Sequence, residues 1–97
     1  MIPENRIPTH PGRILLEEFL EPLGLTQTAL AQHLSISTQR INEIVRAKRG
    51  ITPQTSWLLS QAFNTTPQFW LNLQMQYDLA VQRPQQQVSR LAVAGVF

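Results

Sequence analysis

The stretch TQTALAQHLSISTQRINEIVRAKR, residues 26–49, has the pattern of two short helices joined by a tight turn. Apolar or small residues recur at three- and four-residue spacing on both sides of a polar interruption at residues 35–38. Each helix can therefore turn one side towards a common core. Thr26 and Ser37 stand where N-terminal caps are needed, because a hydroxyl can accept a hydrogen bond from an unpaired backbone N–H. The residues predicted to face inward are Leu30, Ala31, Leu34, Ile41, Ile44 and Val45.

Polar side chains remain on the outer side of the second predicted helix, residues 38–46. They lie in its N-terminal half, the part of a helix-turn-helix that enters the major groove of DNA and meets base edges. Gln39 or Asn42 could hold adenine through two hydrogen bonds, and Arg40 could hold guanine or take a phosphate instead. The predicted base contacts are Thr38, Gln39, Arg40 and Asn42, and the predicted phosphate contacts are Gln27, Ser37, Arg46, Lys48 and Arg49.

Charge is unevenly distributed along the chain, although the formal net charge is only +2. Between residues 35 and 55 there are four basic residues and a single acid, Glu43. This local excess is the electrostatic footprint expected for phosphate contact, and the alternative is an ordinary solvated surface. The first predicted helix is instead acidic and is not expected to face DNA, because it carries Glu17, Glu18 and Glu21.

Residues 1–8 contain two prolines and little periodicity, which predicts an extended arm. A first helix is expected to start near Pro11, since proline is tolerated at a first helical position. Pro22 and Gly24 are expected to end it. The predicted core side of this helix consists of Leu15, Leu16, Phe19, Leu20 and Leu23.

A fourth helix is predicted after the loop that follows residue 46. Thr52 is its expected cap, Pro53 its first residue and Asn64 a left-handed stop. The apolar residues expected on its inner side are Trp57, Leu58, Leu59, Ala62 and Phe63.

A fifth helix is predicted from the cap-and-proline pair at residues 66–67 to about Val81. Its apolar residues are too numerous for one stripe, and in a small domain this predicts a second surface covered by another subunit. The segment 67–97 is therefore interpreted as a dimerisation helix and tail. The tail after Arg83 could form a strand, a short helix or a loose segment. The predicted dimer contacts are Phe69, Trp70, Leu73 and Tyr77.

Residues 26–49 resemble the helix-turn-helix of Cro and phage-repressor-like proteins. The matching residues are Thr26, Gln27, Leu30, Ala31, Leu34, Ile36, Ser37, Ile41 and Ile44. The segments HPG at 10–12, AKRGITP at 47–53 and PQFWLNLQ at 67–74 extend the resemblance to HigA- or VapI-type antidotes of toxin–antitoxin modules. This likeness covers roughly residues 9–80. Ser35 is a departure, because the repressor family usually has glycine there, and a left-handed or bridge conformation must be tolerated.

The length of 97 residues predicts a single domain over 1–97. The resemblance implies that it is all-helical, a compact five-helix lambda-repressor-like domain with its helix-turn-helix at 26–46. It also implies an antidote that neutralises a RelE- or HigB-like mRNA-cleaving toxin and represses the operon encoding both. In this family the glutamine at position 27 contacts the DNA backbone. A homodimer would place two reading helices on a palindromic operator, one DNA turn apart. The acidic first helix, with Glu17, Glu18 and Glu21, is the leading candidate for the toxin contact, and the alternative is that these glutamates only keep the helix solvated.

The sequence offers no catalytic site, metal site or cofactor motif. Neither His10 nor His33 has a carboxylate at ligand spacing, there is no cysteine, and the four glycines form no phosphate-binding loop. The N-terminus lacks a secretory signal and no apolar run could span a membrane, so a cytoplasmic protein is expected.

Two other functions fit the same residues: a phage-type transcriptional repressor without a toxin partner, and a protein-interaction module that keeps the motif only for packing.

Overall fold

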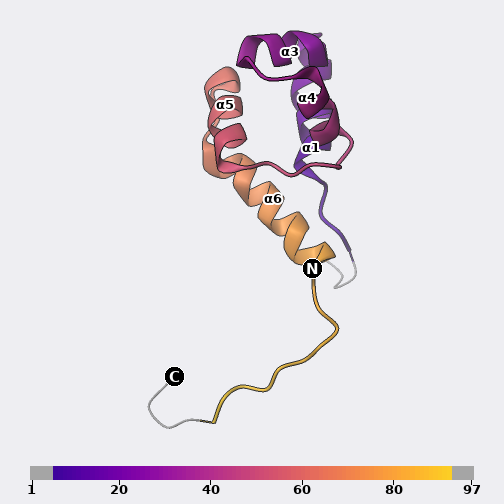
Figure 1. Cartoon of the computed structure of the whole chain (residues 1–97), viewed down its shortest axis with the longest axis vertical. Helices are drawn as coiled ribbons and strands as arrows, with labels where there is room; N and C mark the ends of the chain where they lie inside the picture. Colours follow the sequence, from indigo (N-terminus) through magenta and orange to yellow (C-terminus); the bar gives the residue numbers. More distant parts are fainter. Residues whose placement is uncertain (1–5, 93–97) are drawn as a thin grey trace.

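The computed structural model describes residues 6–92, and its regular structure is entirely helical, as predicted. The elements are α1 (Pro11–Ile14), η1 (Leu15–Leu20), α2 (Glu21–Leu23), α3 (Gln27–Leu34), α4 (Thr38–Val45), α5 (Pro53–Phe63) and α6 (Pro67–Val81). The elements α1, η1 and α2 follow one another without a break and form the single first helix that the sequence predicts. In Figure 1, α3 and α4 lie next to each other at one end of the molecule, and α6 runs from α5 towards the other end.

The first helix is wider in the middle than a regular α-helix. The segment η1 is π-helical, and the N–H of Glu21 donates to the carbonyl of Leu16, five residues earlier. Proline inside a helix normally collides with the carbonyl four residues before it. The π-helical turn directly before Pro22 displaces that carbonyl, so the helix continues for one more turn and ends at Gly24, whose φ is +62°.

The other four helices begin at the caps predicted from sequence. The cap hydroxyls are those of Thr26, Ser37, Thr52 and Thr66, each accepting from the backbone N–H three residues later at 3.0–3.2 Å. Two helix ends are left-handed without glycine, at Ser35 (φ 58°) and Asn64 (φ 55°). The predicted conformations of both residues are confirmed, so the turn of the helix-turn-helix forms at some conformational cost.

The core is built from side chains of all the helices. Its fully buried apolar members are Leu15, Leu20, Leu30, Ala31, Ile41, Ile44, Ile51, Leu59 and Trp70. Two residues predicted for the core are instead at the surface: Leu23 is 64% exposed and Trp57 is 58% exposed. The inner side of α5 carries hydroxyl residues in place of Trp57. Ser56 and Ser60 are buried there because each hydroxyl donates to a carbonyl one turn earlier in the same helix, at 2.6 and 2.8 Å.

The segment HPG at residues 10–12 joins the first helix closely to α4. Nδ1 of His10 accepts from the N–H of Gly12 at 2.9 Å and caps α1. Burial lowers the pKa of His10, and the nearby charge of Asp78 raises it by a smaller amount. A Cβ at Gly12 would lie only 1.7 Å from the carbonyl oxygen of Ile44 in α4. Glycine is therefore required at this position by the contact between two backbones.

After α6 the chain leaves the helices and runs away from them (Figure 1). Residues 83–92 form neither helix nor strand. Residues 1–5 of the predicted arm and 93–97 of the tail lie outside the described part of the chain. Helices in the described region fall short of the length and apolar character that crossing a bilayer requires.

Candidate DNA-binding surface

The first turn of α4 presents polar side chains to solvent while its other side is fixed in the core. Thr38 and Gln39 are exposed, whereas Ile41 and Ile44 are completely buried. Ser37 is exposed as well, and its oxygen accepts from the N–H of Arg40 at 3.1 Å, which leaves the hydroxyl hydrogen available to a phosphate. The predicted outward orientation of Thr38 and Gln39 agrees with this arrangement.

Arg40 is half-buried and is held against α5 rather than projecting freely from α4. Its Nη2 donates to Oγ1 of Thr55 at 2.8 Å and lies 3.5 Å from Oε1 of Gln54, both on α5. Its Nε is buried and has no hydrogen-bond partner within residues 6–92. Two-point binding of guanine by this side chain would require the bond to Thr55 to be exchanged for a bond to the base.

Asn42 is also tied to another helix. Its side-chain amide donates to Oε1 of Gln27 at 3.1 Å, which connects α4 to the first residue of α3. The structure therefore brings together a predicted base contact and a predicted phosphate contact. The amide N–H₂ of Gln27 still points its donors away from this bond and can serve a phosphate at the positive end of α3.

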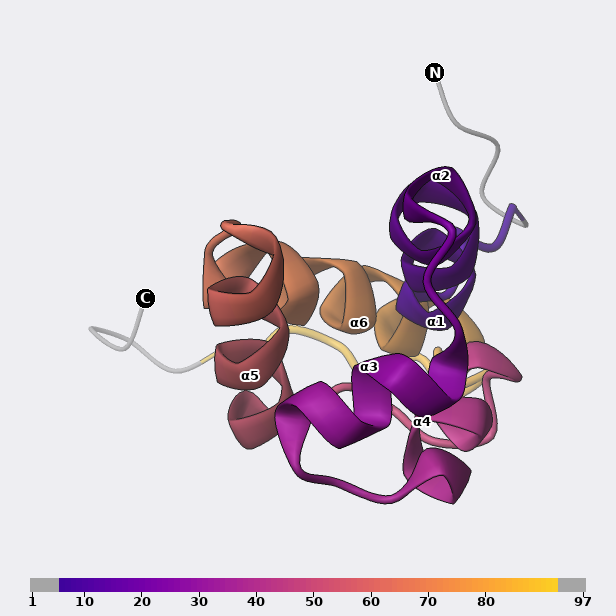
Figure 2. The same ribbon diagram turned by 90° about the horizontal axis from the view of Figure 1, so that it is seen from above.

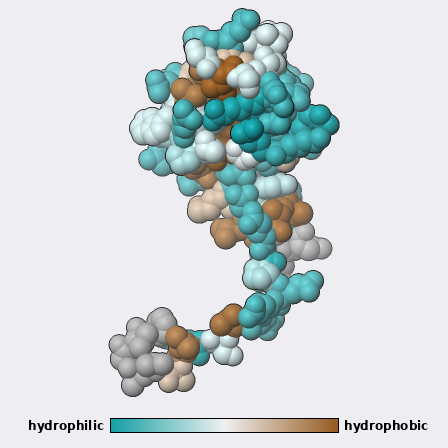
Figure 3. Space-filling model, in the orientation of Figure 1, coloured by the Kyte–Doolittle hydropathy of each residue, from teal (hydrophilic) through white to brown (hydrophobic). Residues whose placement is uncertain are grey.

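The loop after α4 carries the three cationic residues that are predicted to contact phosphate. Arg46, Lys48 and Arg49 are exposed, and the backbone N–H groups of Lys48 and Arg49 both donate to the carbonyl of Glu43, at 2.8 and 3.2 Å. The Arg49 guanidinium lies 2.9 Å from the Glu43 carboxylate, a surface ion pair that contributes little and that a phosphate can replace. Figure 3 shows a hydrophilic surface on the side of the molecule that carries α4 and this loop. We call residues 46–49 the cationic loop.

Comparison with known proteins places this surface in a family. The chain matches a helix-turn-helix family model over residues 16–70, which includes all of α3 and α4. It is 52% identical over 77 residues to virulence-associated protein I of Dichelobacter nodosus, covering 78% of this chain and 71% of that protein. It is 35% identical to antitoxin HigA-1 of Vibrio cholerae, covering 77% of this chain and 70% of that protein. A solved structure of the Pseudomonas aeruginosa antitoxin HigA with the higBA promoter is 44% identical, has a TM-score of 0.76, and matches 77% of this chain and 82% of that one.

The chain belongs to the family of helix-turn-helix antitoxins. This is a family of DNA-binding proteins and regulators, not of enzymes. The capped α4 and the cationic loop both lie within the region that this antitoxin-family chain shares with the helix-turn-helix model.

The predicted dimer contacts on α6 need a correction at Trp70. This side chain is fully buried in the monomer, its ring centroid lies 5.1 Å from that of Phe19, and its indole N–H donates to Oγ1 of Thr65 at 2.8 Å. Trp70 therefore serves the fold of the single chain and has no surface left for a second copy. Of the other predicted contacts, Phe69 is 39% exposed, whereas Leu73 and Tyr77 are half-buried.

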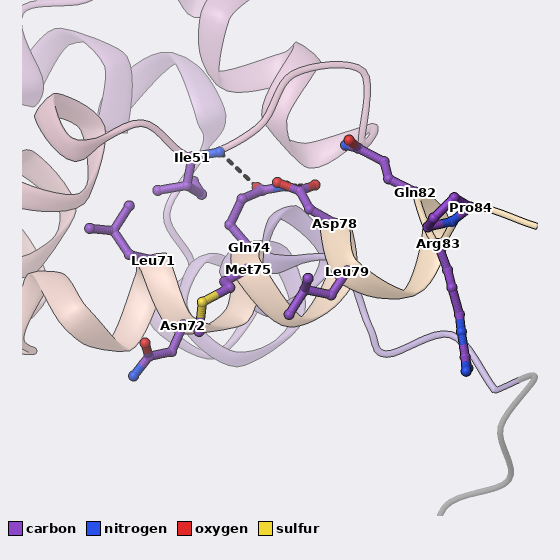
Figure 4. Close-up of a pocket in the computed structure, with 10 residues that line it drawn as sticks. All are labelled: Ile51, Leu71, Asn72, Gln74, Met75, Asp78, Leu79, Gln82, Arg83 and Pro84. Atoms are coloured by element: carbon purple, nitrogen blue, oxygen red, sulfur yellow. Dashed lines mark hydrogen bonds between the residues drawn. The ribbon is translucent and has the colours of Figure 1, made fainter. Parts of the chain in front are cut away.

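A different side of α6 carries the exposed apolar surface. Leu71, Met75 and Leu79 follow one another at four-residue spacing along one side of the helix, and Met75 and Leu79 are 52% and 67% exposed. They line an open groove of about 850 Å³ that continues to Arg83 and Pro84 (Figure 4). The sequence pattern contained this stripe. It could not be separated from the core stripe because apolar residues occur on nearly every side of α6.

Proposed function

We propose that this antitoxin-family protein is a homodimeric repressor of its own operon that also neutralises an mRNA-cleaving toxin of the RelE or HigB type. The observation that carries the repressor function is the capped first turn of α4, which exposes Thr38 and Gln39, while the cationic loop follows the other end of the same helix. The toxin function is supported by the family's antitoxin members. Such a protein acts in the cytoplasm, where its operator and the messenger RNA are both found.

In the proposed complex, base reading depends chiefly on Gln39 and Thr38. Arg40 and Asn42 must each exchange an internal hydrogen bond for a bond to a base, so each contributes less net affinity than an exposed side chain making the same contact. Phosphate contacts position the helix without reading sequence. They are assigned to Gln27, Ser37, Arg46, Lys48 and Arg49.

The proposed dimer forms through the stripe of Leu71, Met75 and Leu79. The other predicted contacts, Phe69, Leu73 and Tyr77, lie on other sides of α6, where Tyr77 packs against His10. Exposed apolar side chains in one row along a helix are best covered by the same row of a second copy, because a two-fold axis makes a surface complementary to itself. Figure 3 shows apolar surface over the part of the molecule where α6 lies. Two-fold symmetry would set two α4 helices against a palindromic operator.

The toxin is proposed to bind the acidic side of the first helix. Glu17, Glu18 and Glu21 are all exposed, and a ribonuclease that grips RNA is expected to be basic. Within residues 6–92, Glu17 alone of the three forms an ion pair, with Arg13 at 2.7 Å, and a partner can replace this surface pair. In Figure 2 the end of this helix, α2, lies at the opposite edge of the molecule from α4, so the toxin and DNA would occupy separate surfaces.

Co-purification tests the toxin function. The tagged protein is expected to retain the product of the neighbouring gene, a small basic protein. The triple variant Glu17→Lys, Glu18→Lys, Glu21→Lys is expected to lose most of this binding, because the complementary field is reversed. Gln39→Ala is the control and should retain the partner fully. A triple variant that is folded and still binds the partner would show that the glutamates only solvate the helix, and wild-type protein that retains no partner would refute the toxin function.

A further inference from the structure

Gln74 connects α6 to the segment that follows the cationic loop. Its side chain is only 8% exposed. Its Oε1 accepts from the backbone N–H of Ile51 at 2.7 Å, and its Nε2 donates to Oδ1 of Asp78 at 2.9 Å. Figure 4 shows the bond to Ile51 crossing from α6 to the chain that leads into α5. Both ends of the amide are therefore engaged, and Asp78 fixes which end faces the loop.

Gly50 shows that the chain here is shaped around the same side chain. A Cβ on Gly50 would lie 3.1–3.2 Å from three atoms of the Gln74 amide group. Among the described glycines only Gly24 has a positive φ, so the backbone conformation does not demand glycine at position 50. A Cβ there would be tight against Gln74, whose amide would have to shift by a few tenths of an ångström. Two consecutive residues, Gly50 and Ile51, thus contact one side chain of α6.

We infer that Gln74 is a positioning residue that fixes the cationic loop relative to α6, and with it the spacing of the two DNA-binding surfaces in a dimer. This inference rests on the proposed function. The last two residues of the cationic loop, Lys48 and Arg49, are held to α4 by the carbonyl of Glu43, and the two residues that follow the loop, Gly50 and Ile51, are held to α6 by Gln74. Because α6 carries the proposed dimer axis, the clamp sets where Lys48 and Arg49 stand relative to the partner's equivalent residues. If the loop were less firmly held, fewer of its cations would contact phosphate in each of the two half-sites.

Gln74→Met tests the clamp, because methionine has similar length and volume but offers neither an N–H donor nor a strong acceptor. The Ile51 amide is expected to exchange its hydrogen with solvent faster in the variant, a readout that needs no DNA. Dimer dissociation should be nearly unchanged, because Gln74, although it lines the groove beside Leu71, Met75 and Leu79, is only 8% exposed. Operator affinity is expected to fall roughly tenfold, as for loss of one well-placed hydrogen bond that orders the loop, with a shallower dependence on salt.

A charge-balanced pair provides the rescue. Gln74→Glu keeps an acceptor for Ile51 but sets a carboxylate against Asp78, so operator affinity should fall. Adding Asp78→Asn restores a donor–acceptor pair with reversed polarity and should recover most of the affinity. If Gln74→Met does not fold, the comparison of Gln74→Glu with the Gln74→Glu, Asp78→Asn double variant tests the inference instead. Failure of the double variant to recover operator affinity overturns the inference.

Two further results would overturn the inference: unchanged Ile51 exchange in Gln74→Met, or parallel losses of dimerisation and operator binding, which would mean that Gln74 only supports α6. Wild-type protein that binds no operator would refute the proposed function, whereas the Ile51 exchange would still report on the clamp.

Discussion

Replacing Gly12 with alanine is expected to destabilise the fold by roughly 3 kcal/mol, at the upper end of overpacking costs and a large share of the stability of a small domain. The added methyl would lie 1.7 Å from the carbonyl oxygen and 2.6 Å from the carbonyl carbon of Ile44. These are backbone atoms that cannot rotate away, so the first helix and α4 must separate. Urea unfolding followed by circular dichroism measures the loss.

Gly24→Ala is the matched control for this substitution. Gly24 has φ +62°, but a Cβ there would meet nothing within 4 Å. Its cost is therefore limited to left-handed backbone strain, about 1 kcal/mol. If Gly12→Ala proved no more destabilising than Gly24→Ala, the close contact between the first helix and α4 would be wrong.

Leu79→Glu is expected to convert the protein to a monomer at micromolar concentration. Leu79 is 67% exposed, so the substitution should hardly change the stability of the single chain, but it would place two carboxylates near each other across the proposed dimer axis. Operator affinity should fall by about 100-fold or more, because the two half-sites would no longer be bound by one linked molecule. Light scattering and operator titration measure the two effects.

The control for Leu79→Glu is Leu23→Glu, the same chemical change at a residue that is 64% exposed at the end of α2. It should remain dimeric and bind the operator normally. A Leu79→Glu protein that stays dimeric would remove α6 from the interface.

Local chemistry made the helix boundaries predictable. Each cap hydroxyl bonds to a backbone N–H three residues away, and the left-handed ends at Ser35 and Asn64 follow from the same short-range rules. The predicted burial of Leu59 in α5 is confirmed, but the burial of Ser56 and Ser60 could not be predicted in this way. Hydrophobicity ranks Trp57 above Ser56 and Ser60, yet the serines are buried because the helix itself satisfies their hydroxyls.

In the candidate site, too, only the features set by local spacing could be predicted. Ile41 and Ile44 are buried in the core, so Thr38 and Gln39 must face outward. The spacing of these residues in the sequence is enough to predict this. The hydrogen bond between Arg40 and Thr55 joins residues 15 positions apart in the sequence, and the bond between Ile51 and Gln74 joins residues 23 positions apart. Such pairs are decided by how helices pack, and no local pattern specifies them. The predicted dimer contact at Trp70 is wrong for the same reason, since only the packed structure shows which side of α6 faces Phe19.

The most direct test of DNA reading by α4 is a paired titration of Gln39→Ala and Arg49→Ala on the operator and on random DNA, at several salt concentrations. Both residues are exposed, so neither change should disturb the fold. Gln39→Ala is expected to cost about 1–3 kcal/mol on the operator and to relax preference at one base pair in each half-site, with little change on random DNA. Arg49→Ala is expected to weaken both complexes and to flatten the salt dependence, because fewer counterions are released. If the two variants lowered operator and random-DNA binding by the same factors, α4 would not be the reading helix.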